Sequence, residues 1–203
     1  MGKEILNKEL VENLLKIKGE TRGFTLRYDG EYVLKSQGEA GLKKLEKELD
    51  SLGCPIEYKA IRATGFFPVG MRAISLLAMK KMFDFDNEKI REIGAFHPKF
   101  PMGIRLFVKY IYSPYEILKT AQRMWRIYYT IGEVSITDYN EKENYALFEI
   151  RNFDIHPIVC RVIEGHIAYL ARMAIKASEA TCRELKCTFE GEAFHQFKVI
   201  WEE

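Results

Sequence analysis

The sequence lacks an excess of charge of either sign, because 31 lysine and arginine residues nearly balance 29 aspartates and glutamates. Nucleic-acid-binding proteins normally carry a basic excess that neutralises phosphates, so this balance argues against that class. No run of 18 apolar residues occurs, and no membrane span is therefore expected. Residues 1–18 form a charged amphipathic stretch without the apolar core of a secretory signal.

Cysteine is scarce as well, with four residues in 203: Cys54, Cys160, Cys182 and Cys187. Four cysteines do not make a disulfide framework in a chain of this length, so a reducing, cytoplasmic location is expected. The sequence also lacks a Gly-x-Gly-x-x-Gly fingerprint and a cysteine set for an iron–sulfur cluster. No residue pattern therefore supports an enzyme that needs an electron donor.

Apolar and aromatic residues are plentiful. The hydrophobic fraction of 47 % excludes a disordered chain, because such a chain can offset the entropy of ordering. The aromatic fraction of 13 % indicates either a bulky core or an aromatic-lined pocket. The length favours one domain over residues 1–203, with segments 1–60, 61–130 and 131–203 differing in pattern.

Helical periodicity recurs along the chain, and Asp86 is a candidate N-cap. The expected helices are 3–18, 41–52, 71–83, 87–96, 103–112, 115–131 and 157–177. Those between residues 68 and 130 are apolar on more than one side. We therefore expect them in the interior or at an interface between two copies of the chain.

Strand alternation predicts three hairpins, over residues 24–35, 134–150 and 183–201. The first turns at Asp29-Gly30, a pair that favours a two-residue turn. Adjacent strand pairs between helices indicate antiparallel rather than parallel sheet. The sequence therefore predicts an α+β fold with helices packed on an antiparallel sheet.

The last hairpin places candidate metal ligands together. A turn centred on Gly191 pairs Cys187 with His195 on the buried face and Leu185 with Phe197, while Glu184 opposes Lys198 on the polar face. A thiol beside an imidazole can hold zinc, which needs three or four ligands. Further candidates are Cys182, Cys160 and His156. The alternatives are a buried cysteine beside a hydrogen-bonded histidine, and a Cys–His nucleophile.

Several segments after residue 129 resemble the 4-vinyl reductase domain family. They are Gly132-Glu-Val, Phe153-Asp-Ile-His-Pro-Ile-Val-Cys-Arg, Gly165, and residues 184–197, which read ELKCTFEGEAFHQF. The resemblance implies the ligand-binding fold of TRAPP-type trafficking subunits and haem–nitric-oxide-binding domains. In that fold helices pack on a twisted antiparallel sheet, and TRAPP members form dimers. His195 replaces the family's second cysteine.

The resemblance and the aromatic helices together predict a non-catalytic domain that binds a small apolar, tetrapyrrole-like or lipid-like molecule as a homodimer. The candidate ligand-binding residues are Phe107, Tyr110, Trp125, Tyr128 and Tyr129. Haem is not expected, because the Tyr-x-Ser-x-Arg clamp of haem-binding relatives is absent. The alternatives are a zinc protein or an enzyme of tetrapyrrole metabolism that uses Cys187 and His195, and a protein-interaction adaptor.

Overall fold

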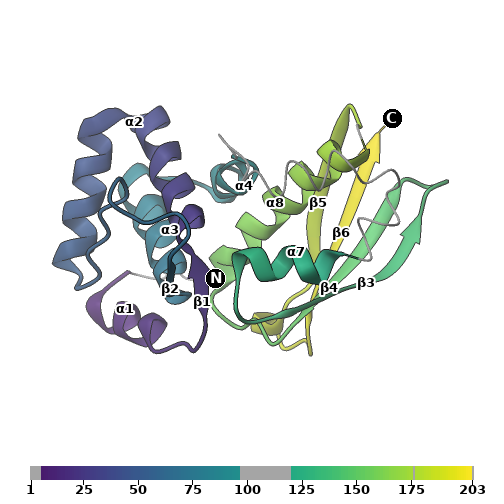
Figure 1. Ribbon diagram of the computed structural model, residues 1–203, viewed down its shortest axis with the longest axis horizontal. Helices are drawn as coiled ribbons and strands as arrows, with labels where there is room; N and C mark the ends of the chain where they lie inside the picture. Colours follow the sequence, from purple (N-terminus) through teal and green to yellow (C-terminus); the bar gives the residue numbers. More distant parts are fainter. Residues whose placement is uncertain (1–5, 97–119, 176, 203) are drawn as a thin grey trace.

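The computed structural model describes residues 6–96, 120–175 and 177–202, and its fold is α+β, as the sequence predicts (Figure 1). One half of the molecule is helical and the other is a four-stranded sheet covered by helices. The expected helix at 103–112 and the candidate ligand residues Phe107 and Tyr110 lie outside the described residues.

The helical half contains α1 (Lys8–Leu15), α2 (Gly23–Ser51) and α3 (Gly70–Phe83). A two-stranded ribbon of β1 (Glu20–Arg22) and β2 (Phe66–Pro68) joins them. Every residue of α3 from Arg72 to Met79 is buried. The two-sided apolar pattern of this helix is therefore satisfied inside a single chain.

The prediction of a hairpin at residues 24–35 is wrong, because these residues belong to α2. Gly30 is not a turn residue there: a Cβ atom at this position would lie 2.5 Å from the Cβ of Tyr58. Asp29 is fully buried and pairs with Arg72 instead of facing solvent in a turn. Tertiary packing thus overrides the local turn preference. The non-helical Gly38 (φ 70°) divides α2 into two helical parts.

The large sheet has the order β3-β4-β6-β5, and all neighbouring strands are antiparallel. Its strands are β3 (Glu133–Asn140), β4 (Tyr145–Arg151), β5 (Glu179–Lys186) and β6 (His195–Glu202). The hairpin expected at 134–150 is confirmed, with Val134 opposite Ile150 and Ile136 opposite Phe148.

The register of the last hairpin is shifted by one residue from the expected one over most of its length. Glu184, not Leu185, lies opposite Phe197, and a bulge between Glu184 and Lys186 restores the expected pairing of Lys186 with Gln196. Leu185 is 54 % exposed, so the bulge turns this leucine outward. Glu184 is thereby moved from the polar face to the buried one.

Helices cover one face of this sheet (Figure 1). The helix α8 (Pro157–Ile175) contacts β5 and β6, and also α3 and α4 (Asn87–Ala95). As expected, α4 begins at the N-cap Asp86, whose side chain accepts a hydrogen bond from the backbone of Lys89. Of the helix expected at 115–131, residues 115–119 lie outside the described residues; α7 (Ala121–Tyr128) forms the described part and ends before the extended Tyr129. None of the helices described is long and apolar enough to cross a membrane.

Candidate functional site

A cavity of about 120 Å³ lies between the large sheet and the helices α7 and α8. The remaining walls come from α2, α3 and α4. The lining is mainly aliphatic and aromatic, as in most small-molecule sites. The apolar lining side chains of the sheet are Val134, Ile136, Tyr139, Ala146, Phe148, Ile150, Val199 and Trp201; those of α8 include Val162, Ile163, Ile167, Leu170 and Ala171.

Three candidate ligand-binding residues, Trp125, Tyr128 and Tyr129, line this cavity. The ring centroids of Trp125 and Tyr129 are 4.7 Å apart, and Phe153 meets both rings edge-on. The indole N–H of Trp125 donates to the carbonyl of Ile131, which fixes the ring. Both tryptophans of the chain face the cavity, because Trp201 of β6 lines it as well.

The cavity has one polar end. Arg72 of α3 lines it, and the guanidinium Nη1 donates to the hydroxyl of Tyr129 at 2.8 Å. Burial raises the pKa values of Tyr128 and Tyr129, with nearby Arg72 only partly opposing this effect, so both phenols stay neutral. His166 of α8 also lines the cavity, with its ring 4.6 Å from that of Tyr128.

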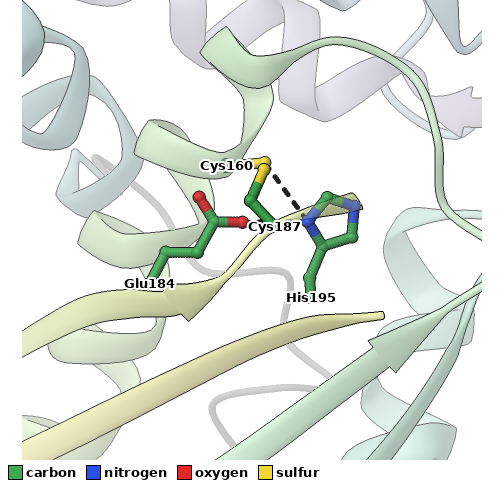
Figure 2. A group of neighbouring side chains, drawn as sticks. All are labelled: Cys160, Glu184, Cys187 and His195. Atoms are coloured by element: carbon green, nitrogen blue, oxygen red, sulfur yellow. Dashed lines mark hydrogen bonds and ion pairs between the residues drawn. The ribbon is translucent and has the colours of Figure 1, made fainter. Parts of the chain in front are cut away.

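A second cluster lies where α8 meets the last hairpin (Figure 2). Ligand atoms of Cys160, Glu184, Cys187 and His195 all lie within 4.8 Å of one another. Cys160 comes from α8, Glu184 from β5, Cys187 directly follows that strand, and His195 begins β6. Two thiols, one carboxylate and one imidazole form a donor set suited to tetrahedral zinc.

Hydrogen bonds fix the histidine in this cluster. Its Nδ1 lies 2.8 Å from Glu184 Oε1 and 3.7 Å from the sulfur of Cys160, while Nε2 lies 3.0 Å from the hydroxyl of Thr188. The imidazole is 1 % exposed. The group is thus an ordered, nearly dry cluster beneath the hairpin.

Burial raises the pKa values of the Cys160 and Cys187 thiols, and the carboxylate of Glu184 adds to the effect. These thiols are therefore protonated at neutral pH and are poor nucleophiles. The pKa of Glu184 shifts the other way: although burial opposes it, the hydrogen bond to His195 and the charge of Arg161 hold the pKa below its ordinary value.

An ionic network supports the cluster from α8 and α4. The buried carboxylate of Glu164 accepts from Arg91 Nε at 2.6 Å, from Arg161 Nη1 at 3.0 Å and from the backbone N–H of Glu184 at 2.7 Å. Arg161 also pairs with the Glu184 carboxylate. Glu164 therefore holds the bulged end of β5 in place.

Cys182, the third ligand candidate from the sequence, is buried on β5 but is not part of the cluster. Cys160 and Glu184 belong to the cluster instead. Sequence reasoning missed Glu184 because the bulge that turns it inward has no local signal. Arg72 was missed too, although a single charge in the apolar run GMRAISLLAM could have indicated it.

No family model and no curated protein matches the sequence. Solved structures do match. An H-NOX protein from S. oneidensis in the Fe(II)NO ligation state aligns with a TM-score of 0.64 at 9 % identity, covering 90 % of this chain and 99 % of its own. An Fe(II) unliganded H-NOX protein from K. algicida gives 0.62 at 12 % identity, covering 90 % and 97 %.

A trafficking protein particle complex subunit 3 from Naegleria fowleri, covalently bound to palmitic acid, aligns over 63 % of this chain and 89 % of its own, with a TM-score of 0.44 and 13 % identity. The chain thus has the H-NOX type of α+β fold. The 4-vinyl reductase family itself is not shown by these comparisons. At such low identity the likeness concerns the fold alone.

Proposed function

We propose that this protein is a non-catalytic sensory or ligand-binding domain that takes a small, mainly apolar molecule into the cavity between α7, α8 and the sheet. The observation that carries this proposal is the cavity itself, lined by Trp125, Tyr128 and Tyr129 and closed by aliphatic side chains. Its volume of about 120 Å³ is close to that of an engineered protein cavity, about 150 Å³, that binds benzene. H-NOX structures with bound iron share the fold and support a sensory role.

Haem does not fit the described cavity. A porphyrin macrocycle is several times larger than a benzene-sized space. His166 is the one imidazole among the described lining residues, and its ring packs edge-on against Tyr128. His97 lies outside the described residues. The favoured ligand is therefore compact rather than a tetrapyrrole.

Toluene tests the cavity directly. We expect saturating toluene to raise the melting temperature and to change the tryptophan fluorescence, because both tryptophans line the cavity and ligands that bind the folded state stabilise it. Ala171→Phe should abolish both effects by filling the cavity. Ala168→Phe, on the same helix but outside the lining, is the matched control and should keep them. Wild-type protein that does not respond to toluene would contradict the proposal.

A second function is favoured by a separate observation, the four donors of Cys160, Glu184, Cys187 and His195 within 4.8 Å. We propose that this cluster binds zinc and ties α8 to the last hairpin. One donor comes from α8 and the other three from the last hairpin. A bound ion would therefore stabilise tertiary structure directly, since binding free energy adds to folding free energy.

Zinc titration of metal-free protein tests this second proposal. Zinc should raise the melting temperature, and Cys187→Ser should weaken binding by more than about 100-fold, since loss of even an outer partner costs 10–100-fold. Cys182→Ser is the matched control: this thiol is also buried, on the same hairpin, but lies outside the cluster. Equal zinc affinity in both variants would exclude the site.

A further inference from the structure

Arg72 is an unusual lining residue. Among the described residues that line the cavity, it alone carries a permanent charge, and none is acidic. It lies in the first turn of α3 and is only 8 % exposed. Burying a guanidinium costs free energy unless its N–H donors are paired, so any donor of Arg72 without a partner needs an acceptor.

The contacts leave donors unused. Nη1 donates to Tyr129, but Nη2 is 3.6 Å from Asp29 Oδ1, an ion pair longer than a hydrogen bond. The Nε–H of Arg72 has no hydrogen-bond partner among the described residues, nor does the buried hydroxyl of Tyr128. Both residues line the same cavity, and the guanidinium charge lowers the pKa of that phenol against the larger effect of burial.

The carboxylate that pairs with Arg72 is not part of the cavity lining. Asp29 of α2 does not line the cavity, whereas Arg72 does. The protein thus holds the guanidinium through Nη1 and Nη2, and the Nε–H stays unpartnered on a residue that lines the cavity. Because Asp29 already offsets part of the positive charge, a singly charged anion matches this end of the cavity better than a dianion such as phosphate.

We infer that the cavity selects a compact apolar molecule bearing one carboxylate, with the carboxylate received by Arg72 Nε–H and the Tyr128 hydroxyl and the apolar body seated against Trp125 and Trp201. This inference rests on the proposed ligand-binding function and names its ligand class. A carboxylate supplies the acceptors that these two donors lack, and hydrogen bonds between ionised partners are the strongest in proteins. Tyr129 and Asp29 act as positioning residues that hold the guanidinium.

Three ring compounds of nearly equal size separate charge from shape: toluene, benzamide and benzoate. Calorimetric titration of the full chain should give a benzoate affinity about 10- to 100-fold higher than that for benzamide, because a hydrogen bond to a charged group contributes about 1.5–3 kcal/mol. Toluene should also bind, because its apolar body fits the cavity without a contact to the Arg72 donors. Equal affinities for benzoate and benzamide would overturn the carboxylate inference alone, and absence of toluene binding would overturn the ligand-binding function as well.

Substitutions test whether Arg72 causes the preference for benzoate over benzamide. The double substitution Arg72→Met/Asp29→Asn removes both buried charges together, and it should abolish the benzoate preference while toluene still binds, which reports an intact cavity. Tyr128→Phe should reduce benzoate affinity by several-fold and leave toluene unaffected. Arg123→Met, an exposed arginine on α7, is the control and should keep the wild-type ratio. A benzoate preference that survives Arg72→Met/Asp29→Asn would overturn the assignment.

Discussion

Asp29 couples the stability of the fold to pH. Burial raises the pKa of its carboxyl from 3.8 to about 6, although Arg72 opposes the shift. A folded-state pKa above the unfolded one means that folding favours the protonated acid. The stabilisation is therefore complete below about pH 4 and is lost as the pH rises through 6.

The substitution Asp29→Asn should remove this dependence. Relative to the variant, the free energy of unfolding of the wild type should fall by roughly 3 kcal/mol between about pH 4 and 7, since each pKa unit corresponds to about 1.4 kcal/mol. Urea unfolding at a series of pH values measures the difference. Asp50→Asn, an exposed position on the same helix, should give a profile parallel to the wild type. If the pH profile of Asp29→Asn ran parallel to that of the wild type, the pH dependence of stability would not come from the buried Asp29 carboxyl.

At the scale of elements, α4 and α8 touch backbone to backbone. A Cβ atom on Gly94 would lie 2.0 Å from the carbonyl oxygen of Val162, and one on Gly165 would lie 1.9 Å from that of Arg91. Neither glycine has a positive φ. Both are thus required by the close approach of the two helices, which also brings Arg91 to Glu164.

Gly94→Ala and Gly165→Ala should each destabilise the protein by about 2–3 kcal/mol, the upper part of the range for overpacking, because backbone cannot rotate away as a side chain can. The double variant should cost less than the sum, since both methyl groups separate the same helix pair. Chemical unfolding measures each value. Lys89→Ala on the exposed surface of α4 should change stability by less than about 0.5 kcal/mol. Tolerance of either alanine would exclude this close packing.

At the scale of the whole molecule, one hydrophobic core connects the two halves. Its buried residues run from Leu6 to Trp201, and α3 contacts α8 between the helical half and the sheet half. We therefore predict one cooperative unfolding transition, as expected for the single domain over residues 1–203.

Two probes test this cooperativity, because one follows both halves and the other follows only the sheet half. Circular dichroism at 222 nm follows the helices of both halves, including α1–α3 and α8, whereas tryptophan fluorescence follows Trp125 of α7 and Trp201 of β6. The two melting curves should coincide. Separate midpoints would show two independent units. The homodimer and the cytoplasmic location stay predictions, and light scattering checks the former.

Periodicity alone predicted much of the fold. The apolar helix at 71–83, the Asp86 cap, the hairpin at 134–150 and the antiparallel α+β architecture follow from local patterns, because burying one face imposes a period of 3.6 or 2 residues. The proximity of a thiol and an imidazole near Gly191 also follows from sequence, since any short turn there brings Cys187 close to His195.

Only the tertiary structure decided the rest. Asp29-Gly30 reads locally as a turn, but the contacts with Arg72 and Tyr58 place it inside a helix. The bulge that carries Glu184 to Cys160, Cys187 and His195 depends on Glu164 and Arg161, which come from another element. Arg72 became a candidate ligand-binding residue only when α3 was packed against α7 and the sheet. The periodic pattern of the sequence indicates which apolar residues are buried; the packing of distant elements determines which polar residues join them and which side chains meet.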